Sequence, residues 1–162
     1  MASSIKNLSD FSHIQVADAS SFKFAIVVAQ WNAEITGALL NGAISGLEKH
    51  GAKESNIEVI EVPGSFELTS GADLALRNQS FDAVICLGCV IQGETRHFDF
   101  ICHAVANGVS NVGLKYNKPV IFGVLTTDNL QQALDRAGGK HGNKGEEAAI
   151  TAIQMAAIAK KI

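Results

Sequence analysis

The sequence has little charge and no long hydrophobic run. Charged side chains make up only 18% of its 162 residues, and the formal net charge is -3. This balance provides no broad positive field, which argues against nucleic acid or an anionic membrane as a partner. No apolar run approaches the roughly 18 residues of a membrane span, and residues 1–16 lack the apolar region of a secretory signal. We therefore expect a cytoplasmic protein that binds no membrane.

Cysteine is also scarce. The three cysteines, Cys86, Cys89 and Cys102, are an odd number and lie inside apolar segments, which indicates buried thiols in a reducing compartment. Cys86 and Cys89 form a C-x-x-C pattern within a predicted strand, where residues three apart point to opposite faces. We therefore expect no redox or metal site there.

What the sequence does contain is an alternation of two patterns. Four short apolar runs, at 24–29, 57–62, 82–89 and 119–125, are typical of parallel strands buried on both faces. Helical spacing is found at about 35–47, 65–77, 98–112, 128–137 and 143–160, with Gly51 ending the first helix and Asp128 as N-cap of the fourth. The order predicts an α/β fold in which helices cover both faces of one parallel sheet.

Residues 1–21 stand outside this alternation. They are polar and rich in serine, so we interpret them as an N-terminal arm that is either a frayed tail or ordered against a neighbour, where it could extend the sheet. Residues 22–162 form the single predicted domain.

Ligands of an open parallel sheet bind at the carboxyl ends of its strands, which directs attention to the residues that follow each run. Trp31, the only tryptophan, follows the first run beside Asn32 and could stack on a planar heteroaromatic ring, although a tryptophan in this place can also cap the core. Pro63 to Glu67 follows the second run. Its backbone amides could hold hydroxyl or carbonyl groups, or it is simply a helix start with Ser65 as N-cap and Glu67 favoured by the helix dipole.

Two further segments are suited to anions and proton transfer. The segment before His97 contains a glycine and Thr95 and leads into a helix, whose N-terminal amides favour an anion. Histidine is a side chain that can both accept and return a proton, so His97 could move protons in both directions, whereas the alternative is a structural histidine. In the glycine-rich turn at 136–145, Arg136 and Lys140 could bind a phosphate, or they could be cations favoured at a helix C-terminus.

Five motifs together resemble one family. They are the aromatic–asparagine pair at 31–32, VPGSFE at 62–67, GCVIQGETRHFDF at 88–100, FGVLTTDN at 122–129 and DRAGGKHGNKGEEAA at 135–149. In this order and spacing they resemble the lumazine synthases, across about residues 22–160. The resemblance implies a flavodoxin-like three-layer α/β/α sandwich on a four-stranded parallel sheet.

The resemblance also implies residue roles. Trp31 would stack on a pyrimidine with Asn32 beside it, and His97 would be the catalytic proton shuttle. The remaining binding residues would be Gly64, Ser65 and Glu67 for the ribityl chain, Val90 and Ile91 for the heterocycle, Gly93, Glu94 and Thr95 near a phosphate, Arg136 and Lys140 on that phosphate, and Phe122 from an adjacent subunit. Two positions depart from the common family pattern, Gln92 in place of arginine and Glu94 in place of a small residue.

The implied reaction joins 5-amino-6-(D-ribitylamino)uracil to 3,4-dihydroxy-2-butanone 4-phosphate in riboflavin biosynthesis, with no cofactor and no metal. The implied assembly is a homo-oligomer, a pentamer or a closed sixty-subunit shell, with riboflavin synthase as a candidate partner. Two alternatives stay open at this point. One is a non-catalytic flavin- or lumazine-binding shell protein, which need not keep Trp31, His97 and Arg136 together; the other is an FMN electron carrier, although the turn after the first run lacks the serine- and threonine-rich loop expected for the FMN phosphate.

Overall fold

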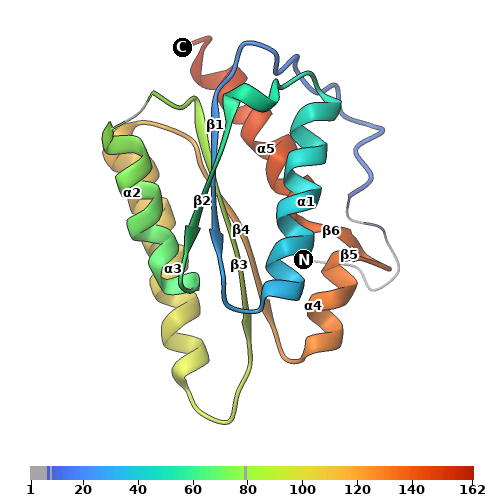
Figure 1. Cartoon of the computed structure of the whole chain (residues 1–162), viewed down its shortest axis with the longest axis vertical. Coiled ribbons are helices and arrows are strands. Elements are labelled where there is room, and N and C mark those ends of the chain that lie inside the picture. Colours follow the sequence, from blue (N-terminus) through green and yellow to red (C-terminus); the bar gives the residue numbers. More distant parts are fainter. Residues whose placement is uncertain (1–6, 8, 79) are drawn as a thin grey trace.

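The computed structural model describes residues 7, 9–78 and 80–162. Its centre is a four-stranded parallel sheet in the order β2-β1-β3-β4 (Figure 1), which confirms the predicted α/β fold. The strands are β1 (Phe24–Ala29), β2 (Ile57–Val62), β3 (Ala83–Ile91) and β4 (Val120–Thr127). β3 and β4 each continue two residues beyond the predicted carboxyl ends, so Val90 and Ile91 belong to a strand and not to the loop after it.

Helices cover both faces of the sheet, as Figure 1 shows. On one face lie α1 (Ala33–Lys49), α4 (Leu130–Arg136) and α5 (Lys144–Ala159), and on the other lie α2 (Leu68–Asn78) and α3 (His97–Tyr116). Two short 3-10 turns, η1 (Glu54–Asn56) and η2 (Ser65–Glu67), flank β2. The layers are those of the three-layer sandwich expected from the sequence.

Alternation along the strands divides the core into two halves. Ile26 and Ile85 are buried against α1 and α5, while their neighbours Val27 and Val84 are buried toward α2 and α3. Each such aliphatic side chain stabilises the fold by roughly 1.5–3 kcal/mol when fully buried. This two-sided burial explains why β1 and β3 read as continuous apolar runs. The same prediction is wrong for β2, an edge strand in which Glu58, Val59 and Glu61 are exposed.

The two strand cysteines follow the same alternation. Cys86 packs in the half of the core beside α2 and α3, and Cys89 packs in the half beside α1 and α5, which confirms that they face opposite ways. Both are buried free thiols, and burial raises the pKa of Cys86 to about 12 and that of Cys89 to about 11. They are core residues.

Two predicted helix caps are wrong. Asn129, not Asp128, caps α4, because β4 runs to Thr127 and the helix begins only at Leu130; the Asn129 side chain accepts a hydrogen bond from the amide of Gln132 (3.0 Å). Ser65 makes no capping bond and instead begins the turn η2. Its hydroxyl lies against Gly88, where an added Cβ would come within 2.6 Å of Ser65 Oγ.

The glycine-rich basic segment is more ordered than the predicted turn. It forms an antiparallel hairpin of β5 (Ala137–Gly139) and β6 (Gly142–Asn143), and Gly138 and Gly142 have φ values of 103° and 85°. Only glycine adopts such angles at no steric cost, which is why a hairpin this short is possible.

Asn143 connects this hairpin to two helices. Its Oδ1 accepts from the amide of Gly145 (2.8 Å) at the start of α5, and its Nδ2 donates to the carbonyl of Ala38 in α1 (3.0 Å). An added Cβ at Gly145 would lie 1.9 Å from the carbonyl oxygen of Leu39, so α1 and α5 approach each other at a point where only glycine fits. Asn143 also confirms the predicted start of the last helix.

The described part of the arm, residue 7 and residues 9–21, contributes no strand to the sheet and packs on its own chain. Ser9 Oγ donates to the carbonyl of Asn143 (3.1 Å) and accepts from its amide (2.8 Å), and Ala19 is fully buried. Residues 1–6 and 8 of the predicted arm lie outside the described residues.

Candidate active site

A pocket of about 800 Å³ opens at the carboxyl ends of β1, β2 and β3. Ten of the residues predicted from the sequence line it: Trp31, Asn32, Gly64, Ser65, Glu67, Val90, Ile91, Gly93, Thr95 and His97. They come from three separate segments of the chain, 31–32, 64–67 and 90–97, which the parallel sheet brings to one edge.

The first wall of the pocket is the turn between β1 and α1. Trp31 is 72% exposed, so its ring is not part of the core, contrary to the alternative of a core-capping tryptophan. The amide of Trp31 donates to the carbonyl of Pro63 (3.1 Å), which extends the pairing of β1 with β2 beyond the last ladder residues. A large aromatic surface is thereby presented to solvent at the pocket.

The second wall is the turn from Gly64 to Glu67. The amide of Glu67 donates to the carbonyl of Gly64 (3.2 Å), and an added Cβ at Gly64 would lie 3.1 Å from Glu67 Oε2. The carboxylate therefore lies close over Gly64, where a larger residue would crowd it. Ser65 is buried beneath them, with its hydroxyl against Gly88 in β3.

The third wall is the loop between β3 and α3. The amide of Gln92 donates to the carbonyl of Thr127 (2.8 Å), and the Gln92 side-chain amide donates to the carbonyl of Gly93 (2.7 Å). The hydroxyl of Thr95 accepts from the amide of His97 (3.4 Å), the first residue of α3. His97 is exposed at a helix N-terminus, where the dipole and the unpaired amides of the first turn favour an anion.

Four predicted site residues do not line this pocket. Glu94 is an exposed residue of the loop, and Phe122 lies half-buried against the core on the α2 and α3 side. Arg136 and Lys140 line a separate pocket of about 460 Å³ beside α4 and the hairpin. Within one chain, therefore, the basic cluster is not joined to the larger pocket.

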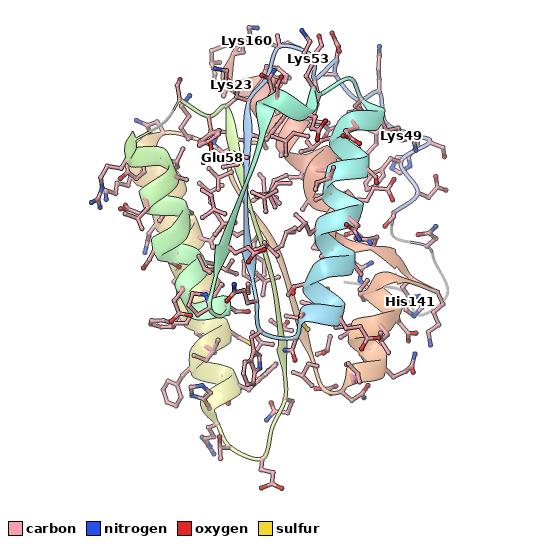
Figure 2. The ribbon with its side chains drawn as sticks, viewed as in Figure 1. Lys23, Lys49, Lys53, Glu58, His141 and Lys160 are labelled. Carbon is pink, nitrogen blue, oxygen red and sulfur yellow. The ribbon has the colours of Figure 1, made fainter. Side chains whose placement is uncertain are left out.

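The basic cluster is held by carboxylates. Arg136 Nη1 lies 2.7 Å from Glu147 Oε1 and donates to the carbonyl of His141 (2.8 Å), and Lys140 Nζ lies 3.0 Å from Asp135 Oδ2. The hydrogen bond from Lys140, followed by the one from Gln131, lowers the pKa of Asp135 below its usual range. Figure 2 shows His141 at the hairpin.

The smaller pocket also contains a buried polar atom without a protein partner. Thr127 is only 7% exposed, and its Oγ1 has no hydrogen-bond partner among the described residues. A buried hydroxyl without a partner is costly, so a polar group from outside the chain would be stabilised there.

Sequence reasoning missed four residues of the larger pocket: Phe66, Cys89, Phe98 and Ile101. Phe66 is 56% exposed in the second wall. Phe98 and Ile101 belong to the apolar spacing that predicted the third helix, and they follow His97 closely at the start of α3. Apolar residues one and four positions after His97 lie in the same first turns of the helix, and this closeness to a candidate catalytic residue could have identified them.

Three lysines lie far from the larger pocket, whereas Arg96, the N-cap of α3, lies between its lining residues Thr95 and His97. Lys23, Lys53 and Lys160 lie at the opposite edge of the molecule, where the strands begin (Figure 2). Across 7, 9–78 and 80–162, no three His, Cys, Asp or Glu side chains are grouped as metal ligands would be. No helix in these same ranges combines the length and apolar character needed to cross a membrane.

Comparison with known proteins gives one consistent result. A family model described as 6,7-dimethyl-8-ribityllumazine synthase matches residues 21–160. A protein of that name from Cytophaga hutchinsonii is 62% identical over 157 residues, covering 97% of this chain and 98% of the relative. A protein of the same name from Parabacteroides distasonis is 54% identical, covering 96% of this chain and 97% of the relative. Another from Phocaeicola vulgatus is 50% identical, covering 100% of this chain and 96% of the relative. The chain therefore belongs to the 6,7-dimethyl-8-ribityllumazine synthase family.

Proposed function

We propose that the larger pocket is where this chain, as a 6,7-dimethyl-8-ribityllumazine synthase of riboflavin biosynthesis, condenses 5-amino-6-(D-ribitylamino)uracil with 3,4-dihydroxy-2-butanone 4-phosphate. One observation carries the proposal. A single pocket joins an exposed tryptophan, a tight polar turn at 64–67 and a histidine at a helix N-terminus. These three features match a flat ring, a polyhydroxyl chain and a proton-transferring reaction on an anionic substrate.

The pyrimidine would stack on Trp31, whose exposed ring offers a flat apolar surface of matching shape. Val90 and Ile91 at the end of β3 would meet the ring edge through their backbone groups. The ribityl hydroxyls would bind at Gly64, Ser65 and the carboxylate of Glu67, which accepts hydrogen bonds. Asn32 would lie beside the ring.

His97 would serve the proton transfers of the reaction. The 5-amino nitrogen attacks the ketone, and loss of water gives an imine; the C–O bond to phosphate then breaks as a neighbouring carbon loses its proton. The ribitylamino nitrogen closes the second ring with loss of another water. The overall products are the lumazine, inorganic phosphate and two waters. The imidazole of His97 would accept and return these protons, and the pocket would hold the two substrates in position.

The phosphate of the second substrate would bind at the loop of Gly93, Glu94 and Thr95, beside the N-terminus of α3. Glu94 would contribute its backbone amide, because its carboxylate would repel a phosphate. Arg136, Lys140 and Phe122 would complete this site from a second subunit. The separation of the two pockets within one chain, and the orphan Thr127 hydroxyl in the smaller one, support this arrangement.

A site shared in this way requires a homo-oligomer. We propose at least a pentamer, and a closed sixty-subunit particle in which the short hairpin at 137–143 lets neighbouring pentamers meet. We also propose a cytoplasmic location, supported by three free thiols, and riboflavin synthase as a partner, since its substrate is the lumazine formed here.

The decisive experiment is incubation of the purified protein with both substrates, followed by measurement of the fluorescent lumazine and of released phosphate. Product that forms only when both substrates are present would support the proposal. Tight binding of lumazine or flavin without turnover would instead favour the non-catalytic shell protein. Flavin absorbance in the purified protein, with no turnover, would favour the electron carrier.

A further inference from the structure

The link between β1 and α1 consists of only three residues, Gln30 to Asn32. The amides of Gln30 and Trp31 still bond toward β2, to the carbonyls of Val62 (2.8 Å) and Pro63 (3.1 Å). Asn32 then reverses the chain with φ 60° and ψ 48°, and its carbonyl accepts from Ile35 in the first turn of α1 (2.9 Å). Asparagine tolerates this left-handed conformation better than most residues.

The side chain of Asn32 reaches in the other direction, to β3. Its Nδ2 donates to the carbonyl of Cys89 (2.9 Å) in a partly buried bond. The backbone pairing of β1 with β3 ends at Val28 and Leu87, so this amide adds one bond beyond the end of the ladder. Because the acceptor is a carbonyl, the amide nitrogen must face it, which fixes the orientation of the side chain.

The same bond bears on Trp31. Its ring is 72% exposed and receives little support from the core. Its position therefore depends on its backbone, which is held on one side by Pro63 and on the other by the Asn32 conformation and its bond to β3. Cys89 itself lines the pocket, so the bond also sets the separation of the first and third walls.

We propose that Asn32 is a positioning residue: its side-chain amide locks the β1–α1 turn onto β3 and so holds Trp31 in place for the pyrimidine. This inference rests on the proposed function for the stacking role of Trp31. It departs from the sequence-based expectation of a direct ligand, because the amide nitrogen is already committed to the protein.

The test compares two asparagine-to-glycine substitutions in the whole protein. Asn32→Gly keeps the left-handed backbone and removes the amide. The control is Asn117→Gly, which makes the same change at the C-cap of α3. Among the described residues, Asn117 (φ 50°) and Asn32 are the two non-glycine residues with a left-handed backbone, and Asn117 lines neither of the two pockets discussed above. Because Trp31 is the only tryptophan, its fluorescence reports this turn alone.

Two readouts are measured, fluorescence anisotropy of ligand-free Trp31 and its quenching by 5-amino-6-(D-ribitylamino)uracil. For Asn32→Gly we expect lower anisotropy and about three- to tenfold weaker pyrimidine binding, because one hydrogen bond is lost. The KM for the butanone phosphate should stay unchanged. Asn117→Gly should match the parent in every readout. Unchanged anisotropy with weakened binding would overturn the proposal in favour of direct ligand contact, and no change in either would overturn it outright.

Asn32→Asp keeps the size and left-handed tolerance of asparagine but its carboxylate cannot donate to Cys89. It should reproduce the effects of Asn32→Gly and serves if the glycine variant folds poorly; full parental anisotropy and binding would contradict the proposal. Failure of the parent protein to bind the pyrimidine would refute the proposed function, whereas the ligand-free anisotropy would still decide whether Asn32 positions Trp31.

Discussion

Arg136 and Glu147 form a close ion pair, with 2.7 Å between Nη1 and Oε1, and their side chains are only 16% and 14% exposed. Glu147 also pairs with Lys144 (3.2 Å), while the same Nη1 of Arg136 bonds to the carbonyl of His141. Both of these contacts of Arg136 use the one guanidinium nitrogen Nη1. The rest of the planar fork can serve a phosphate.

Replacement of Arg136 by lysine should therefore raise KM for the butanone phosphate about tenfold or more and leave pyrimidine affinity nearly unchanged. A single ammonium cannot satisfy Glu147, His141 and a bidentate phosphate together. Steady-state kinetics with each substrate varied would measure this. Arg77→Lys, at an arginine paired with Asp73 outside both pockets, is the matched control. A selective loss of pyrimidine affinity would remove Arg136 from the phosphate site.

His97→Ala should slow lumazine formation roughly ten- to a thousandfold, close to the usual range for a general acid–base residue. His97 begins α3 and is exposed, so folding should be retained. The control is His103→Ala in the same helix, whose ring nitrogen Nδ1 lies 2.7 Å from the carbonyl oxygen of Asp99 and which does not line the larger pocket. Equal turnover in the two folded variants would exclude His97 from the mechanism.

A shared site predicts complementation between inactive variants. His97→Ala and Arg136→Ala subunits, unfolded together and reassembled at equal ratio, should recover about a quarter of parental turnover, since random pairing reunites the two intact residues in that share of sites. Sedimentation would confirm the assembly and its size. A fully active monomer would disprove the shared site, whereas an active free pentamer would disprove only the sixty-subunit shell.

The thiols should differ in reactivity. Burial raises the pKa of Cys86 and Cys89 to about 12 and 11, so neither forms thiolate at pH 8, while Cys102 is only partly buried. A colorimetric thiol reagent should label at most one cysteine per native chain and three after denaturation. Cys102→Ser should abolish the native reaction; persistence of a fast thiol in that variant would contradict the core assignment.

Asp73 should contribute to acid-sensitive stability. It bonds to Lys115, Arg77 and Tyr116 and joins α2 to α3, and the bond to Lys115 lowers the pKa of Asp73 below its usual range. This stabilisation is present above about pH 4, the ordinary aspartate pKa, and is lost as the pH falls through the folded-state value.

Asp73→Asn should accordingly lower the free energy of unfolding by about 1 kcal/mol at pH 7, with the difference from the parent shrinking below pH 4. Urea unfolding at several pH values would show it. Glu48→Gln, at an exposed carboxylate of α1, removes the same charge and should have almost no effect. A difference that persists at pH 3 would point to packing instead of charge.

Periodicity predicted the strands and helices well because buried parallel strands and amphipathic helices leave strong local patterns, as at residues 24–29 and 98–112. It missed the hairpin at 137–143, since two very short strands have no periodicity and depend on the positive φ of Gly138 and Gly142. The cap was predicted one residue early, at Asp128, because the exact ends of β4 and α4 depend on backbone geometry that a local pattern does not record.

The residues singled out after the predicted strands, such as Trp31 and His97, line one pocket of the structure, while their roles stay a prediction. The residues alone did not indicate that Arg136 lines a separate pocket of the chain or that Phe122 lines neither, because nothing in their local sequence records which pocket they face. The bond from Asn32 to Cys89 joins residues 57 positions apart and depends on backbone geometry that composition does not encode.

The bonds of Asn143 have a mechanical consequence. They join the hairpin, α5 and α1 through one amide, beside a contact that admits only glycine. We expect these segments to move together as one rigid unit with the β1–α1 turn, which precedes α1. We therefore expect flexing inside the chain to bring the basic cluster little closer to the larger pocket. If the site is shared, it would open and close through relative motion of the two subunits that form it. A crosslink between these subunits would then trap bound phosphate without altering any ligand-binding side chain.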